Sequence, residues 1–169
     1  SLGYIGIYEA TLLTKHCSHT TPEGRKFAMR IMDSFNEHIA AWKKETNIGF
    51  ALYGTPAENL TNLFCKIDKA RFGSIKDVTD KGYYTNSYHV DVREPINVFD
   101  KFKFEADFEE KSTGGCISYA EIPNMTHNIP AVLTMVQFIY DHIAYAEFNT
   151  KLDYCHECGF DGEIILNDD

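Results

Sequence analysis

Short apolar runs that alternate with stretches of helical spacing restrict the fold of this chain more than any other feature. Four runs have the length and composition of buried strands, at residues 49–53, 87–92, 115–122 and 146–148. Four stretches with helical spacing of apolar residues lie beside them, at residues 22–44, 56–67, 95–108 and 129–143. Alternating strands and helices predict an α/β fold with a largely parallel sheet.

The first predicted helix has the clearest boundaries. Thr21 is a favourable capping residue, Pro22 suits the first helical position, and Glu23 places an acid in the first turn. Lys43 suits the negative end of the helix dipole, and the Asn at position 47 is expected to stop the helix.

Composition and charge exclude several classes of protein. The chain of 169 residues is 44% hydrophobic, which is enough for one packed domain, and it has no run of about 18 apolar residues that could span a membrane. A net charge of −9 disfavours general nucleic-acid binding. The five cysteines are irregularly spaced, and no signal peptide is recognisable at the start, so we expect a cytoplasmic protein with reduced thiols. The first residue is Ser1 rather than Met, which favours a piece of a longer protein.

A strand-to-helix junction at residues 53–59 is the segment that most suggests ligand binding. Thr55 and Glu58 have the spacing of a capping box, and Pro56 would take the first helical position. Such a junction points unpaired backbone N–H groups at the carboxyl edge of the sheet, where phosphates bind. A well-capped helix without a ligand explains the same residues and, because capping boxes are common, is the more frequent case.

Other polar segments also have an ordinary structural explanation. The Asn86 amide and the Ser87 hydroxyl could bind a ligand's hydroxyl groups, but a capped turn accounts for them as well. His89 is a lone histidine, which is more often satisfied in a core than catalytic. The glycines at 114 and 115 suit either a close ligand or a plain loop, and the cluster at 16–19 is too crowded for one tetrahedral metal.

A Cys-x-x-Cys-Gly segment near the end of the chain has the form of half a zinc ribbon. Cys155 and Cys158 would supply two thiolates from one tight turn, and two more ligands would be needed for a tetrahedral site. A redox pair is possible in principle, but such a pair normally opens a helix near the start of its fold. We expect a domain boundary here, with an α/β body at 1–153 and a truncated ribbon at 154–169.

Taken in order, five segments resemble the anaerobic (class III) ribonucleotide reductases. The matching segments are residues 1–10, 21–24, 53–58, 84–89 and the Cys155/Cys158 pair. The resemblance covers essentially the whole chain. It implies the C-terminal part of the catalytic barrel, about half of a ten-stranded α/β barrel of the glycyl radical enzyme type, with a zinc half-site at its end.

The resemblance also implies a function. Enzymes of this family reduce ribonucleoside triphosphates to deoxyribonucleotides by glycyl and thiyl radical chemistry, with formate as reductant, ATP and dNTPs as effectors, a radical-SAM activase and a homodimeric assembly. Cys155 and Cys158 would be the first pair of four zinc ligands. The thiyl cysteine and the radical glycine would lie outside this sequence, so no residue here is expected to be catalytic and the chain alone is expected to be inactive.

The resemblance favours a substrate role for the strand-to-helix junction. The predicted substrate-binding residues are Gly54, Thr55, Ala57, Glu58, Asn86 and Ser87. Those at 54–58 would form a cradle for the phosphates, and Asn86 and Ser87, with Tyr84 and His89, would line the opening of the same substrate site. The alternatives are a free-standing zinc-binding α/β interaction module and a fragment of another glycyl radical enzyme.

Overall fold

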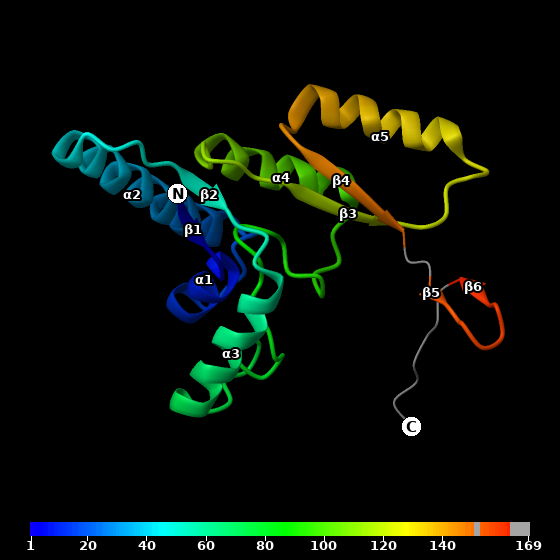
Figure 1. The fold of residues 1–169 in the computed structure, drawn as a ribbon, viewed down its shortest axis with the longest axis horizontal. Coiled ribbons are helices and arrows are strands. Elements are labelled where there is room, and N and C mark those ends of the chain that lie inside the picture. The colour runs from blue at the N-terminus through cyan, green and yellow to red at the C-terminus, as the bar shows by residue number, and fades with distance from the viewer. Residues whose placement is uncertain (151–152, 163–169) are drawn as a thin grey trace.

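The computed structural model of the chain describes residues 1–150 and 153–162, and Figure 1 shows their arrangement. In this part of the chain the helices are α1 (Ile7–Lys15), α2 (Pro22–Thr46), α3 (Glu58–Phe72), α4 (Val98–Lys111) and α5 (Ile129–His142). The strands are β1 (Leu2–Tyr4), β2 (Leu52–Gly54), β3 (Ser118–Ile122), β4 (Ala146–Thr150), β5 (Asp153–Tyr154) and β6 (Asp161–Gly162). The protein is therefore a mixed α/β structure, as the alternation predicts.

The strands pair in three separate groups within the described residues. β1 and β2 are parallel, with Gly3 opposite Tyr53, and β3 and β4 are parallel, with Ala120 opposite Phe148. β5 and β6 form an antiparallel pair at the C-terminal end of the described chain. The parallel pairing agrees with the prediction, but the described strands do not join into one sheet.

Helix α2 begins and ends at the predicted signals. The Thr21 hydroxyl accepts a hydrogen bond from the Gly24 N–H at 3.1 Å, and Pro22 occupies the first turn. Gly24 lies so close to the preceding loop that an added Cβ would be 2.0 Å from the Ser18 carbonyl oxygen. Asn47 ends the helix in the left-handed conformation, with φ of 55°.

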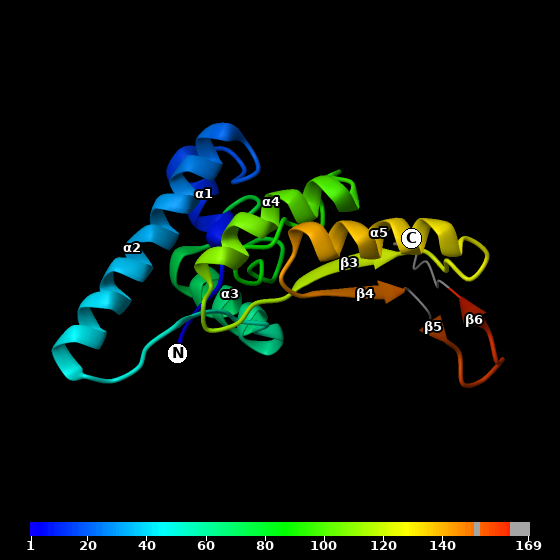
Figure 2. The ribbon, with the colours of Figure 1, turned by 90° about the horizontal axis from the view of Figure 1, so that it is seen from above.

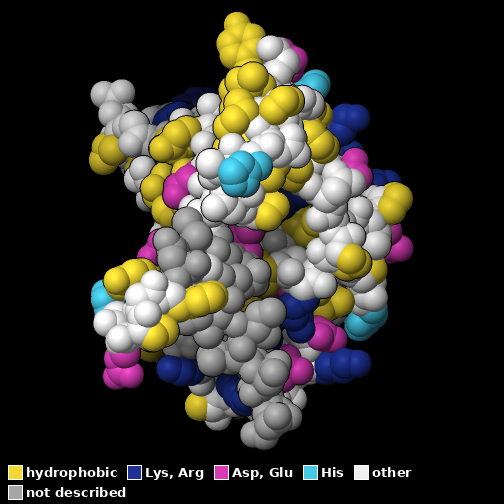
Figure 3. Space-filling view, turned by 90° about the vertical axis from the view of Figure 1, so that its right-hand side faces the viewer, with side chains coloured by type: hydrophobic (Ala, Val, Ile, Leu, Met, Phe, Trp, Pro, Cys, Tyr) yellow, Lys and Arg dark blue, Asp and Glu magenta, His cyan; other side chains and the backbone are white. Residues whose placement is uncertain are grey.

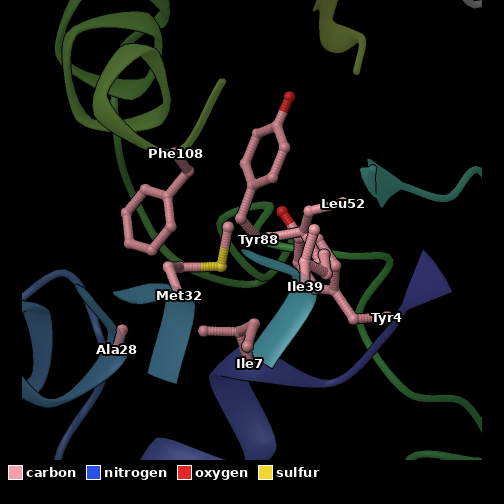
Figure 4. Packing of buried hydrophobic residues seen from close by; sticks show 8 residues of the cluster. All are labelled: Tyr4, Ile7, Ala28, Met32, Ile39, Leu52, Tyr88 and Phe108. Carbon is pink, nitrogen blue, oxygen red and sulfur yellow. The ribbon is translucent and has the colours of Figure 1, made fainter. Parts of the chain in front are cut away.

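One hydrophobic cluster joins β1, β2, α2 and α4. Its buried members are Tyr4, Ile7, Ala28, Met32, Ile39, Leu52, Tyr88 and Phe108. Figure 4 shows Met32 of α2 pointing towards the rings of Tyr88 and Phe108, and these two rings stack at 5.8 Å between centroids. Because Tyr88 belongs to a loop far along the chain from α2, this cluster fixes that loop on the body of the protein.

A second cluster packs α4 and α5 against one face of β3 and β4 (Figure 2). Ala120 and Ile122 on β3, with Ala146 and Phe148 on β4, face the two helices, as the alternation of side chains along a strand requires. Tyr119 and Asn149 therefore lie on the opposite face, which these helices do not cover. The outer side of α5 is apolar, and Leu133 on this helix is 62% exposed. Hydrophobic side chains of this region are visible at the top of Figure 3.

The predicted strand at 87–92 is wrong. This segment follows a turn in which the His89 N–H donates to the Asn86 carbonyl at 3.0 Å, and Ser87 has a positive φ of 38°. Residues 87–91 are all buried, as a buried strand would be, but they belong to none of the paired strands of the described chain. Backbone groups here bond to side chains instead of a neighbouring strand, as when the Val90 N–H donates to Glu105.

Other elements are shifted or were not predicted. α4 begins three residues later than Pro95 because Asn97, not Pro95, caps it by accepting a hydrogen bond from the Asp100 N–H. The regular strands at 52–54 and 118–122 are shorter than the predicted runs at 49–53 and 115–122, and the first extends one residue beyond its run. Helix α1, at the N-terminal end, carried no predicted signal.

Among the described residues, no helix is both long and apolar enough to cross a membrane. The predicted boundary near Tyr154 stays a prediction, and residues 163–169 of the predicted ribbon lie outside the described part of the chain.

Candidate functional site

A cavity of about 530 Å³ lies between the start of α3, the segment 83–94 and the uncovered face of β3 and β4. Its lining includes Glu58, Asn86, His89, Lys101, Tyr119 and Asn149. The residues therefore come from the start of α3, from α4, from the β3–β4 pair and from the long loop between α3 and α4. The cavity is rich in carboxylate, amide and tyrosine groups, a mixture suited to a polar ligand.

The start of α3 differs from the predicted capping box. The first helical residue is Glu58, and the residue before it, Ala57, makes no side-chain capping bond. The Thr55 hydroxyl donates to the Tyr53 carbonyl at 3.2 Å and is therefore turned back towards β2. The capping box is wrong because Thr55 satisfies its own strand end and leaves the helix to be capped from elsewhere.

Asn86 supplies the missing cap from a distant loop. Its side-chain oxygen accepts a hydrogen bond from the Ala57 N–H at 3.0 Å. The first intrahelical bond runs from the Thr61 N–H to the Ala57 carbonyl, so the N–H groups of 58–60 have no partner within the helix. These groups carry the positive end of the helix dipole, and they lie beside the cavity that Glu58 and Asn86 line.

The other predicted substrate residues lie behind the cavity wall. Gly54 donates its N–H to the Gly115 carbonyl at 2.9 Å, and an added Cβ would be 3.0 Å from the Tyr88 ring. Ser87 is 1% exposed, and its hydroxyl has no hydrogen-bond partner among the described residues. Thr55 and Ala57 belong to the junction but are not part of the lining described above.

The paired glycines at 114 and 115 serve the fold. The Gly114 N–H donates to the Leu52 carbonyl at 2.6 Å, and an added Cβ on Gly114 would lie 2.7 Å from that oxygen. Gly115 adopts a φ of 126° and contacts the Tyr53 ring. Glycine is needed here because the segment lies directly against β2, which supports the plain-loop explanation over a ligand contact.

Buried ion pairs hold the loop that carries Asn86. Lys81 lies 2.5 Å from Glu9 of α1, contacts Asp91, and donates to the Thr85 hydroxyl at 3.1 Å. Glu9 in turn accepts from both the Thr85 N–H and the Thr85 hydroxyl at 2.8 Å. The loop therefore has a charged core of its own, anchored to α1.

Asp91 joins this core to the surface. Its carboxylate is buried, and it accepts from the Arg93 Nε at 2.9 Å and from Lys81. Burial works against ionisation of Asp91, but the hydrogen bonds from Arg93 and Lys81 outweigh it and lower its pKa to about 2. Arg93 extends the network to the exposed Asp77 at 3.0 Å.

A second buried carboxylate, Glu105 of α4, lies behind His89. It is fully buried, and Lys101 is 2.7 Å away. The His89 Nδ1 lies 3.4 Å from the Glu105 Oε1, and the His89 ring is edge-on to Tyr119 at 5.5 Å. The ring thus lies between a buried anion and the cavity.

The cluster at 16–19 has a structural role. His19 is fully buried, its Nε2 lies 3.0 Å from the Tyr88 carbonyl, and burial lowers its pKa. The Cys17 sulfur accepts a hydrogen bond from the Thr21 hydroxyl. These contacts agree with a loop that supports α2.

Cys155 and Cys158 lie on a tight turn. The Gly159 N–H donates to the Cys155 carbonyl at 2.8 Å, and Gly159 has a φ of 73°. Hydrogen bonding from Cys158 and the Glu157 backbone lowers the pKa of the Cys155 thiol, which favours the thiolate that a metal requires. No group of three or more candidate metal ligands occurs among the described residues, so this turn offers half a site.

Sequence reasoning missed Lys81, Lys101, Glu105 and Tyr119. The spacing of Lys101 and Glu105, four residues apart on a helix, was visible but is usual for a solvated helix face. Nothing in the pattern indicated that this pair faces inwards. Only the packing of the loop onto α4 brings it to the cavity.

Comparisons with known proteins agree on one family. A family model described as "Anaerobic ribonucleoside-triphosphate reductase" matches residues 1–167. The anaerobic ribonucleoside-triphosphate reductase of Escherichia coli (strain K12) is 44% identical over 166 residues, covering 97% of this chain and 23% of that protein. The reductase of Enterobacteria phage T4 is 42% identical over 164 residues, covering 97% of this chain and 26% of that protein.

Solved structures show the same fold. An anaerobic ribonucleotide reductase matches with a TM-score of 0.79 at 22% identity, covering 94% of this chain and 25% of that one. The Thermotoga maritima enzyme with dATP bound in the specificity site matches with a TM-score of 0.76 at 22% identity, covering 94% of this chain and 27% of that one. The chain spans about a quarter of the length of the curated relatives that it matches. Its near-complete coverage by the family model shows that the chain belongs to the anaerobic ribonucleoside-triphosphate reductase family.

Proposed function

We propose that this chain forms the part of an anaerobic ribonucleoside-triphosphate reductase that holds the substrate. The observation that carries the proposal is the cavity at the start of α3, in a chain 44% identical to the Escherichia coli reductase. The family match favours this function over a free-standing zinc-binding module and over another glycyl radical enzyme. The radical groups, the formate reductant, the radical-SAM activase, the homodimeric partner and the cytoplasmic setting belong to the proposal for the whole enzyme.

The triphosphate would bind at the N-terminus of α3. Three backbone N–H groups at 58–60 have no intrahelical partner, and phosphate oxygens are natural acceptors at such a position. Gly54, Thr55 and Ala57 would shape the loop that brings the phosphates to these groups. Asn86 would adjoin them, since it already bonds to Ala57, and Ser87 would support Asn86 from the buried side.

The two strand pairs would form part of the catalytic barrel. Both are parallel, and β3 and β4 carry helices on one face and polar residues on the other. In a barrel the face away from the helices is the interior, so Tyr119 and Asn149 would point to the reaction chamber. This placement would put the substrate cavity inside the barrel.

Thr55→Val in the full-length enzyme tests the cradle. The change preserves shape but removes the hydroxyl that holds the junction to Tyr53, so CTP affinity should fall by about tenfold, the value of one hydrogen bond. Equilibrium dialysis with radiolabelled CTP measures it. Thr134→Val is the matched control, because the Thr134 hydroxyl also bonds a backbone carbonyl but on the exposed side of α5. Unchanged CTP affinity in Thr55→Val would show that the cradle is wrong.

Reduction by the whole enzyme tests the activity. Activated full-length protein supplied with formate should convert CTP to dCTP under anaerobic conditions, measured by chromatography of the nucleotides. Nucleotide binding without any dCTP would contradict the proposed reaction.

Zinc would be held by Cys155 and Cys158 with two ligands from outside the described residues. The lowered pKa of the Cys155 thiol and the tight turn fit a thiolate pair, and zinc here would stabilise the fold of the ribbon. Full-length protein should contain one zinc per chain by elemental analysis. Cys155→Ser or Cys158→Ser should lose most of it, and Cys17→Ser should keep it. Full zinc content in both Cys155→Ser and Cys158→Ser would exclude this site.

A further inference from the structure

The His89 ring lies where a reactive group could contact a ligand in the cavity. His89 is not one of the residues proposed to bind the phosphates. Its ring lines the cavity although the residue is only 8% exposed. The Nδ1 atom is fully enclosed and faces Glu105 at 3.4 Å. Because Nδ1 is enclosed, the ring edge that carries Nε2 is the edge that a ligand in the cavity can reach.

Glu105 is fixed firmly enough to orient this ring. It accepts from the Val90 N–H at 3.1 Å and from the Lys101 Nζ at 2.8 Å, and Lys101 also donates to the Tyr119 carbonyl at 2.7 Å. Burial works against ionisation of Glu105, but the contact with His89 and the charge of Lys101 outweigh it, so its pKa falls to about 2. A fixed carboxylate next to Nδ1 selects the tautomer that leaves Nε2 unprotonated towards the cavity. The 3.4 Å separation is long for a hydrogen bond, but such contacts often tighten when substrate binds.

The position of His89 relative to the cradle indicates which part of a nucleotide it meets. Its N–H donates to the Asn86 carbonyl at 3.0 Å, so one tight turn carries both His89 and the residue that caps α3. Tyr119, which the His89 ring contacts, shares the uncovered strand face with Glu121 and Asn149, and both of these also line the cavity. Carboxylates repel phosphate but accept hydrogen bonds from hydroxyl groups. The sugar is covalently joined to the phosphates, so it would lie against this wall.

We propose that His89 is a catalytic residue that binds a ribose hydroxyl of the substrate and exchanges its proton, with Glu105 as the positioning residue behind it. The inference rests on the proposed function. As the hydroxyl O–H bond breaks, its electron pair stays on oxygen and its proton forms a bond to the Nε2 of the neutral imidazole. Glu105 stabilises the imidazolium that results, and the proton returns by the reverse step.

A binding experiment tests the ribose contact without turnover. Full-length protein is titrated with CTP and with 2′,3′-dideoxyCTP, each in competition with radiolabelled CTP. The wild-type preference for CTP should fall by about tenfold in His89→Leu, while the affinity for dideoxyCTP stays the same. His38→Leu, which changes an exposed histidine on α2, is the matched control and should keep the preference.

Turnover separates proton exchange from binding. His89→Gln keeps a hydrogen-bonding group but cannot take up a proton, so it should bind CTP within about threefold of wild type and lose about 10²- to 10⁴-fold in kcat. Glu105→Gln should also lower kcat with little change in CTP affinity. Added imidazole should restore part of the activity of His89→Ala, where the ring is missing, and none of that of Glu105→Gln, where it is present.

The outcomes distinguish failure of the role of His89 from failure of the proposed function. An unchanged preference for CTP in His89→Leu, or an unchanged kcat in His89→Gln, would overturn the role of His89. Wild-type protein that fails to bind CTP would overturn the proposed function itself. Thermal melting of each variant shows whether it is folded. If His89→Leu does not fold, His89→Gln replaces it as the deciding variant. Its kcat must then fall while its affinity for CTP stays near that of the wild type.

Discussion

Lys81 is the single residue on which most buried charge in the loop between α3 and α4 depends. It neutralises Glu9 and Asp91, and its side chain is only 4% exposed. Its ammonium also lies over the rings of Tyr8 and Tyr83, at 4.9 and 4.4 Å from their centroids. Removing one member of a buried ion pair is costly because the partner charge stays buried without compensation. Lys81 therefore stabilises the segment that presents Asn86 and His89 to the cavity.

Lys81→Met should destabilise this loop by about 3 kcal/mol. Hydrogen exchange by mass spectrometry on full-length protein would show faster exchange in peptides that cover 81–93. The control is Lys111→Met, which breaks the more exposed pair with Asp33 and should cost less than about 1 kcal/mol. Equal effects of the two substitutions would mean that the buried network does not hold the loop.

At the scale of elements, the sequence predicts structure well where local signals agree with packing. α2 and α5 follow their helical spacing closely, and β4 lies at the predicted run. The segment 87–92 was mistaken for a strand because its β-branched and aromatic residues suit one, whereas its burial depends on α2 and α4, far away in the sequence. The capping box failed for the same reason, since Asn86 caps α3 across 29 positions. Contacts between residues far apart in the chain produce no periodic pattern in the sequence.

The close approach of residues 114–116 to β2 is an element-scale feature that can be tested. Gly114→Ala would place a methyl group 2.7 Å from the Leu52 carbonyl and 2.9 Å from the Ala51 Cβ. We expect a loss of about 1–3 kcal/mol, because two backbone segments must separate. Thermal melting of the full-length protein measures it. Gly49→Ala is the control: a Cβ there meets nothing within 4 Å, so its melting temperature should not fall. A Gly114→Ala variant as stable as Gly49→Ala would contradict the close packing.

At the scale of the whole molecule, the two parallel strand pairs are joined through a loop whose interior is charged rather than apolar. Hydrophobic clusters hold each strand pair to its helices, while the carboxylates of Glu9, Asp91 and Glu105 hold the loop between them. The cavity lies between this loop, the start of α3 and the β3–β4 pair. Its shape should therefore depend on the ionisation of buried carboxylates more than on the apolar cores.

Acid should accordingly open the cavity before it unfolds the strand pairs. Asp91 and Glu105 have pKa values of about 2 in the folded protein, below the ordinary values of about 4 for such groups. A lowered folded-state pKa adds stability that is fully present above the ordinary value and is lost as the pH falls from about 4 towards 2, by roughly 3 kcal/mol for each group. Hydrogen exchange, corrected for the intrinsic rate at each pH, should show peptides 81–93 losing protection over this range before those of α2. Asp91→Asn should lower protection already at pH 7 and weaken its pH dependence, whereas Asp33→Asn, at an exposed position, should do neither. Simultaneous loss of protection in α2 and the loop would show that the cavity and the core unfold as one unit.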